Sequence, residues 1–172
     1  HAVEGYECNP ALVAFADGFL PRQGCDARVR WLPRDEVPAA GEPFDGIVVG
    51  WSAYTLISGR AHRIDLLRRL RPLVRPGGPI LLSFFTRSAD GPRVRVSAAV
   101  ANAIRAVLRR ERAERGDALA PNFVHYFTSA EIGAELREAG WEPKRFTAQG
   151  TGARDSGWAV GIAPGGEAEA AS

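Results

Sequence analysis

The 172-residue sequence contains no methionine, only two cysteines and a single lysine, Lys144. Cys8 and Cys25 are too few for a disulfide framework, and no second pair or nearby histidine predicts a zinc site. No apolar run approaches the roughly 20 residues that span a bilayer, and no basic-then-apolar leader is present. These absences predict a cytoplasmic protein with no membrane contact and no bound metal.

Charge and composition are those of an ordinary globular chain. The 22 basic and 20 acidic residues give a net charge of +2, and 45% of the residues are hydrophobic. The arginine-rich segment 109–115 interleaves both signs, so we interpret it as a solvated helix face. Nucleic-acid affinity needs uncompensated positive charge, and we therefore expect no nucleic-acid partner.

Capping residues predict where the helices begin. Asn9 followed by Pro10 indicates a helix start, because asparagine caps free backbone N–H groups and proline suits the first helical position. Thr128 and Glu131 form the pattern of a capping box, and Gly140 closes the helix that follows. Helices are expected at residues 10–20, 60–74, 96–108 and 129–140.

Strands are expected between these helices. The apolar runs within 44–51 and 80–85 lack the alternation of half-exposed strands and suit strands buried on both faces of a parallel sheet. Alternating strands and helices predict an α/β fold, with a mostly parallel sheet and flanking helices. We expect one domain over residues 1–163 and a flexible tail over 164–172. The remaining strands are expected at residues 2–7, 28–32, 141–149 and 157–163.

Acidic residues follow the first two expected strands. Glu7 closes the first strand, and Asp35 and Glu36 lie in the loop beyond the second. Ligands of open α/β sheets bind beyond the carboxyl ends of the strands. A carboxylate at Glu7 can accept both hydroxyl protons of a ribose, and Asp35 can accept a proton from an adenine amine. Taken singly, each residue fits better as a solvated acid than as a ligand-binding group.

The segment 50–54 follows the third expected strand. Gly50 allows close backbone approach, Ser52 and Tyr54 carry hydroxyls, and Trp51 and Tyr54 carry aromatic faces. These groups can line a ligand site at one rim of the sheet. Aromatic residues after a strand also belong to many protein cores, and the segment alone leaves both interpretations open.

The order of these pieces resembles the class I S-adenosylmethionine-dependent methyltransferases over nearly the whole chain, residues 4–163. The first strand is followed by an acidic residue and a capped helix, and the second strand by another acidic residue. The third strand leads into the segment 50–54, and a helix, a Pro-Gly-Gly turn and a fourth strand complete the order. Four segments carry the resemblance: GYECNP at 5–10, FDGIVV at 44–49, LRPLVRPGG at 70–78 and HYFT at 125–128.

The resemblance implies methyl transfer from S-adenosylmethionine to oxygen or nitrogen of a small-molecule acceptor, by in-line displacement. It implies a seven-stranded sheet whose last strand, residues 157–163, runs antiparallel. It also implies the cofactor-binding residues: Glu7 at the ribose, Cys8 and Asn9 beside the adenosine, Asp35 and Glu36 on the adenine side, and Gly50, Trp51 and Ser52 at the methionine moiety. Tyr54 would face the acceptor.

The family's first strand and Gly-rich loop would precede Ala2, and the sequence holds nothing equivalent. The chain also begins with His1 and lacks methionine. We interpret it as a fragment without that strand and loop, and expect it to be unstable or poorly active alone because two inner strand edges would be unpaired.

Three residues are candidates on the acceptor side. His125 can act as a general base with Tyr126 as an orienting hydroxyl, and Arg87 can attract an acidic acceptor. Each also fits a structural role, His125 near a helix cap and Arg87 as a rim charge. The long segment 90–127 predicts a cap over the acceptor pocket.

Two other functions stay open. One is a non-catalytic methyltransferase-like domain that pairs with a companion chain or a second copy. The other is a different Rossmann-like nucleotide-binding protein, such as a nicotinamide-dependent reductase. Two motifs argue against it: the Glu-Cys-Asn-Pro helix start at 7–10 and the Pro-Gly-Gly turn at 76–78.

Overall fold

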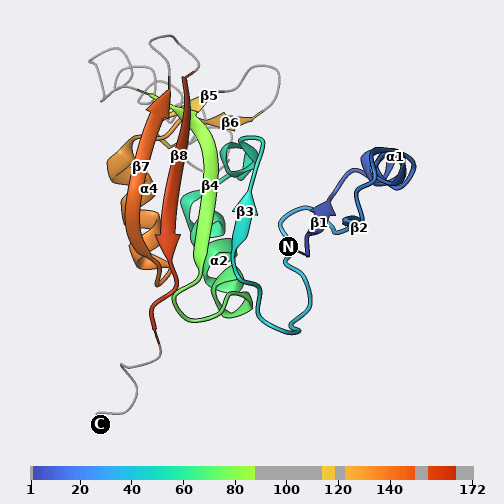
Figure 1. Ribbon diagram of the computed structural model, residues 1–172. Coiled ribbons are helices and arrows are strands. Elements are labelled where there is room, and N and C mark those ends of the chain that lie inside the picture. The colour runs from blue at the N-terminus through green and yellow to red at the C-terminus, as the bar shows by residue number, and fades with distance from the viewer. Residues whose placement is uncertain (1, 88–113, 119–122, 150–154, 166–172) are drawn as a thin grey trace. The chain divides into compact units, whose positions relative to one another are not determined.

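The computed structural model describes residues 2–87, 114–118, 123–149 and 155–165 (Figure 1). Contacts divide the chain into two compact units, unit 1 (His1–Ala40) and unit 2 (Gly41–Ser172), which we describe in turn. The expected helix at 96–108 and most of the expected tail lie outside the described residues. The single domain over 1–163 stays a prediction.

Unit 1 contains a two-stranded parallel sheet and one helix. Strand β1 (Glu4–Glu7) pairs with β2 (Arg28–Trp31), and α1 (Pro10–Phe19) with the 3-10 turn η1 (Pro21–Gln23) connects them. The side chain of Asn9 accepts a hydrogen bond from the Ala11 N–H at 3.0 Å, which confirms the predicted helix start.

Unit 2 is built on a four-stranded sheet in the order β3-β4-β8-β7 (Figure 1). Strands β3 and β4 are parallel, and β8 is antiparallel to both β4 and β7, so three strands share one direction. The mostly parallel α/β fold and the antiparallel last strand are confirmed. The elements are β3 (Ile47–Val49), η2 (Ala53–Leu56), α2 (Arg60–Leu70), η3 (Arg71–Leu73), β4 (Pro79–Thr86), β5 (Asp117–Ala118), β6 (Val124–His125), α4 (Ser129–Glu138), β7 (Glu142–Gln149) and β8 (Asp155–Ile162).

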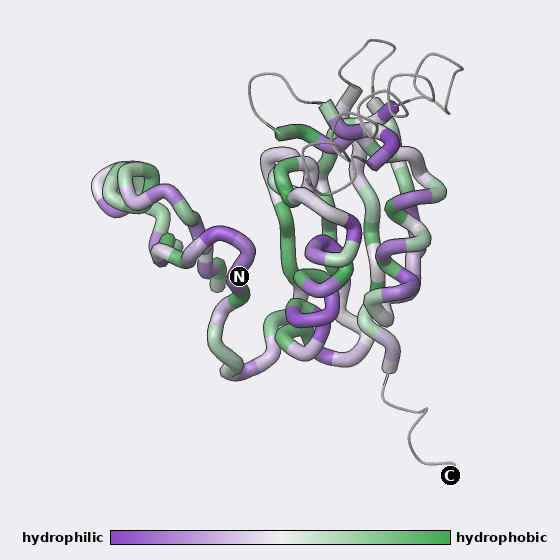
Figure 2. Tube along the Cα trace, turned by 180° about the vertical axis from the view of Figure 1, so that it is seen from behind, coloured by the Kyte–Doolittle hydropathy of each residue, from purple (hydrophilic) through white to green (hydrophobic). Residues whose placement is uncertain are grey.

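Helices α2 and α4 pack side by side on one face of this sheet (Figure 1). Both alternate between hydrophobic and hydrophilic colour along their turns, as helices that bury one face do (Figure 2). No described helix is long and apolar enough to cross a membrane. The core joins α2, α4 and the sheet through Ile64, Leu67, Leu70, Ile80, Leu82, Phe84, Ile132, Leu136 and Trp141.

Helix α2 and strand β3 differ most from the sequence predictions. Helix α2 ends at Leu70 and passes into η3, because Pro72 lacks the N–H that a continuing helix needs. Strand β3 is shorter than expected and is not buried on both faces. Val48 is 66% exposed. It pairs with Leu81, on the face opposite Ile80 and Gly161, and Leu136 of α4 lies against Gly161.

The start and end of α4 follow the sequence pattern. Thr128 and Glu131 bond reciprocally, side chain to backbone, which confirms the capping box. Gly140 has φ +82°, a left-handed conformation that glycine adopts without steric cost, and the Trp141 N–H then donates to the Leu136 carbonyl at 2.9 Å.

Candidate active site

The turn that follows β3 has a strained backbone. Trp51 and Ser52 adopt φ angles of 53° and 55°, a left-handed conformation that costs residues with a side chain about 1–2 kcal/mol each. Ser83 on β4 holds the turn, because its Oγ accepts from the Ser52 N–H at 2.7 Å and donates to the Val49 carbonyl at 3.0 Å. Trp51 is 100% exposed, so burial of its indole does not offset the strain.

Backbone strain marks positions that the sequence singles out as cofactor-binding. Within the described ranges, only Asp35, Trp51 and Ser52 combine a side chain with a positive φ. Each follows the carboxyl end of a strand, Asp35 in unit 1 and the other two in unit 2. Glu36, the neighbour of Asp35, is exposed. Such strain concentrates at functional sites, and the amino-acid sequence does not reveal it.

The 3-10 turn η2 carries the chain from this turn into the core. The Ala53 N–H donates to the Gly50 carbonyl at 2.9 Å. Tyr54 is fully buried, its ring stacks on Phe127 with centroids 5.3 Å apart, and its hydroxyl donates to Glu135 at 2.7 Å. Burial, and then the Glu135 carboxylate, raise the pKa of Tyr54 well above its ordinary value. The ring predicted to face the acceptor thus lies inside the core.

Arg63 of α2 is the centre of a buried ion network. Its side chain is 1% exposed, donates to both carboxylate oxygens of Glu135 at 2.7–3.2 Å, and donates to Glu114 at 2.7 Å. Burial lowers the pKa of Arg63, but the bonds to Glu135 and Glu114 outweigh it, so its pKa lies above the ordinary value. Glu114 also accepts the Arg60 N–H and caps α2, because Gly59 provides no side-chain cap.

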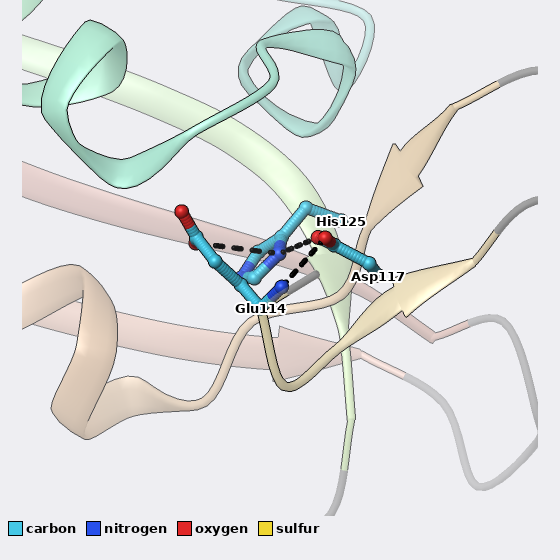
Figure 3. A group of neighbouring side chains, drawn as sticks. All are labelled: Glu114, Asp117 and His125. Carbon is cyan, nitrogen blue, oxygen red and sulfur yellow. Dashed lines mark hydrogen bonds and ion pairs between the residues drawn. The ribbon is translucent and has the colours of Figure 1, made fainter. Parts of the chain in front are cut away.

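His125 lies beyond the carboxyl end of β4, where Thr86 forms a parallel bridge with Phe127. Nδ1 of His125 is 2.7 Å from Oδ1 of Asp117, its direct partner in the antiparallel β5–β6 pair. Glu114 approaches the same nitrogen at 3.9 Å (Figure 3). The His125 ring is 2% exposed, and it packs edge-on against Phe127 with centroids 4.5 Å apart.

Glu114, Asp117 and His125 each offer one potential metal-ligand atom, and these atoms lie within 4.8 Å of one another. Hydrogen bonds already engage all three residues. Arg63 binds Glu114 at 2.7 Å, and the Glu114 N–H donates to the second carboxylate oxygen of Asp117 at 2.8 Å. A cation would have to displace the guanidinium or the proton between His125 and Asp117. The group is therefore arranged as an ion network, not as a coordination shell.

Tyr126 and Arg87 are joined to each other. Nε of Arg87 donates to the Tyr126 carbonyl at 2.9 Å, and the Tyr126 ring stacks on Phe85 with centroids 5.9 Å apart. The Arg87 guanidinium also pairs with Glu131 of the capping box. This arginine already forms an ion pair, and its attraction for an acidic acceptor stays a prediction.

Glu7, Cys8 and Asn9 form the turn between β1 and α1. An oxygen of Glu7 accepts the Asn9 N–H at 2.8 Å, and the Trp31 indole N–H donates to the Cys8 carbonyl at 3.2 Å. The side chain of Cys8 is exposed. A carboxylate offers about four lone-pair sites, so Glu7 keeps the capacity to accept ligand hydroxyls.

Several residues that build the site were missed by the sequence analysis. Ser83 lies within an apolar strand, and Arg63 and Glu135 are single charges on otherwise apolar helix faces, which is a readable signal of a buried pair. Asp117 carries no such signal. It meets His125 only because β5 and β6 pair.

No family model and no curated protein matches the sequence. Solved structures do match the fold. An S-adenosylmethionine-dependent methyltransferase from Methanosarcina mazei aligns over 95% of this chain and 82% of its own, with a TM-score of 0.74 at 16% identity. The chain has the fold of the class I S-adenosylmethionine-dependent methyltransferases.

Two further methyltransferase structures share this fold. The 1,6-didemethyltoxoflavin-N1-methyltransferase of Burkholderia thailandensis, solved with bound 1,6-didemethyltoxoflavin and S-adenosylhomocysteine, has a TM-score of 0.63 at 20% identity, over 95% of this chain and 62% of its own. An amino pentose methyltransferase from Micromonospora echinaspora, bound to S-adenosylmethionine, has a TM-score of 0.59 at 18% identity, over 94% and 74%. The methyltransferase fold is therefore shared at low identity.

Proposed function

We propose that the chain transfers a methyl group from S-adenosylmethionine to oxygen or nitrogen of a small-molecule acceptor. The observation that carries the proposal is the strained Trp51–Ser52 turn at the carboxyl end of β3, held by Ser83 within a methyltransferase fold. An exposed turn keeps such strain when contacts with a ligand need that backbone. The acceptors in the names of two similar structures, a toxoflavin precursor and an amino pentose, support a small-molecule acceptor.

The donor and acceptor groups suit an adenosine with a methionine tail. Glu7 would accept the ribose hydroxyls, Cys8 and Asn9 would flank the adenosine, and Asp35 and Glu36 would meet the adenine amine. On the methionine side, the exposed indole of Trp51 offers an aromatic face to a sulfonium, which is a cation. Gly50 and Ser52 would approach the same moiety through their backbone.

S-Adenosylmethionine supplies a methyl group that its positive sulfur already activates. The residues of the chain then mainly position the acceptor and exclude water. His125 would take a proton from acceptors that must lose one early, and Tyr126 would orient the acceptor. Arg87 would attract an acidic acceptor, and Tyr54 would support the site from the core through its bond to Glu135.

Calorimetric titration of S-adenosylhomocysteine into the full chain tests the proposal. We expect binding that Glu7→Gln weakens by about ten-fold, the loss of one charge-assisted bond. Glu42→Gln, at an exposed acid, is the matched control and should bind normally. A folded chain that does not bind S-adenosylhomocysteine overturns the proposal. Tighter binding of a nicotinamide dinucleotide would favour a reductase.

Trp51→Gly separates strain from binding in the same assay. Glycine adopts the left-handed turn freely, so the variant should be more stable by about 0.5–1 kcal/mol. It should bind S-adenosylmethionine, which carries the sulfonium, at least about ten-fold more weakly. A variant that is more stable and binds normally would show that the indole does not touch the cofactor.

A second candidate function is a partner-binding domain of the same fold. Strand β3 pairs only with β4 among the described strands, and the exposed Val48 lies on it. Unpaired edges of this kind accept strands from other chains. Light scattering that finds a stable dimer, or a stable complex with a companion chain, would favour this function when the same sample fails to bind S-adenosylhomocysteine.

A further inference from the structure

Asp117 and His125 form a buried pair that no pattern in the sequence predicts. They lie directly opposite each other in the β5–β6 ladder, with Oδ1 and Nδ1 2.7 Å apart. The side chains of Asp117 and His125 are 7% and 2% exposed. A pair this short and this buried holds the imidazole in one orientation.

The surroundings fix both members of the pair. The second oxygen of Asp117 accepts the Glu114 N–H at 2.8 Å, so the carboxylate cannot swing away. Gly116 has φ +104°, and a Cβ there would lie 2.3 Å from the Tyr126 carbonyl oxygen, so only glycine lets the two strands approach this closely. Phe127 covers one side of the imidazole.

The hydrogen bond decides which ring nitrogen carries the proton. A carboxylate only accepts, so the proton of a neutral His125 must lie on Nδ1, and Nε2 keeps its lone pair. Glu114, the other carboxylate facing the ring, is 3.9 Å away and bonded to Arg63. Asp117 alone therefore sets the tautomer.

We propose that Asp117 is the positioning residue for His125, holding it as the Nδ1–H tautomer so that Nε2 takes the proton of the methyl acceptor. The inference rests on the proposed function. Strand β6 packs against η2, which follows the Trp51–Ser52 turn, so the pair lies at the same edge of the sheet as that turn.

The proton balance of the step is simple. The O–H or N–H bond of the acceptor breaks and the proton moves to Nε2. The electron pair left on the acceptor forms the bond to the methyl carbon, and the bond between that carbon and sulfur breaks. The products are the methylated acceptor, S-adenosylhomocysteine and an imidazolium, whose charge Asp117 stabilises until the proton passes to water.

Carbethoxylation by diethyl pyrocarbonate tests the tautomer, because the reagent attacks the nitrogen that holds the lone pair. The exposed His62 is an internal standard in the same sample, and peptide mass spectrometry follows both residues. An amide can donate to Nδ1 and move the proton to Nε2. We therefore expect Asp117→Asn to slow modification of His125, relative to His62, by at least about ten-fold.

A merely structural Asp117 predicts the opposite result. Its loss would loosen the buried ring, and modification of His125 would become faster or stay unchanged, which overturns the inference. A wild-type His125 that resists the reagent entirely would remove it as a proton acceptor for any small molecule, and also overturns the inference.

A second measurement leaves the Asp117–His125 pair unaltered. The chain has three histidines, so the 15N shifts of His125 are those that remain in both His1→Gln and His62→Gln. We expect the Nδ1–H pattern in the wild-type chain, and an Nε2–H pattern overturns the role of Asp117. Neither readout uses S-adenosylmethionine, so these results stand apart from the outcome of the cofactor titration.

Discussion

The two units differ in what holds them together. Every fully buried apolar side chain in the described parts of the chain lies in unit 2, whereas no residue described in unit 1 is buried. Unit 1 nevertheless has a regular helix and two paired strands. Its exposed large apolar side chains are Val3, Leu12, Phe15, Phe19 and Trp31.

Local and distant contacts therefore make different contributions in the two units. The start of α1 is fixed within three residues, by the Asn9 side chain and Pro10. The start of α2 depends instead on Glu114, which is 54 positions away from Arg60. In unit 1, local capping specifies where α1 begins without a core. In unit 2, distant contacts between elements stabilise the helices.

Breaking the Arg63 network should have the largest effect. Arg63→Leu leaves Glu135 and Glu114 without their buried partner, and removing one member of a buried ion pair costs about 3–5 kcal/mol. Arg60→Leu removes the exposed pair with Glu138 from the same helix and should cost less than about 1 kcal/mol. Urea denaturation measures both, and equal losses would show that the network contributes no more than a surface pair.

Leucine truncations compare the helices of the two units directly. Leu67→Ala in α2 removes a side chain that is 0% exposed and should cost about 2–5 kcal/mol. Leu12→Ala in α1, at a position 52% exposed, should change the unfolding free energy by less than about 0.5 kcal/mol. A large loss from Leu12→Ala would mean that α1 is buried in solution.

Alkaline pH should weaken unit 2 through Tyr54. Burial raises the pKa of this phenol, so above about pH 10 the unfolded chain loses a proton that the folded chain keeps. The unfolding free energy then falls, by up to about 1.4 kcal/mol per pH unit. Tyr54→Phe should be less stable at neutral pH, where it lacks the bond to Glu135, but should show a flatter decline when denatured between pH 9 and about pH 11.

A small, local effect is expected at the start of α1 in unit 1. Asn9→Ala removes the cap of α1 and should cost about 1 kcal/mol, seen as faster hydrogen exchange of the first amides of α1. Exchange in α4, which keeps its own capping box, is the control within the same molecule. Faster exchange in both helices would mean that the two units unfold together.

Much of the fold could be predicted because its signals are local. Asn9, Pro10, Thr128, Glu131 and Gly140 set helix ends through contacts within a few residues, and the apolar stripe of α2 is buried as its spacing indicates. The exposure of Val48 could not be predicted, because the apolar run at 47–49 does not reveal which face of the sheet the helices cover.

The candidate site could be predicted only in part, for the same reason. Trp51 and Ser52 follow a strand directly, so their place at its carboxyl end is readable. Tyr54 lies three residues further on, where a single 3-10 turn sends its ring into the core. Asp117 could not be predicted, because its role exists only through strand pairing with His125.

The cap that Glu114 provides for α2 also has a consequence in time. Ribosomes add roughly 5–20 residues per second, so the 54 positions between Arg60 and Glu114 separate their synthesis by about 3–10 s. Throughout that interval the first turn of α2 has neither a local cap nor its distant one, and the positive charge of Arg63 has no carboxylate partner. Glu135, which completes the ion network, is made later still. The nascent chain therefore carries an incomplete helix start until the segment that contains Glu114 has been made.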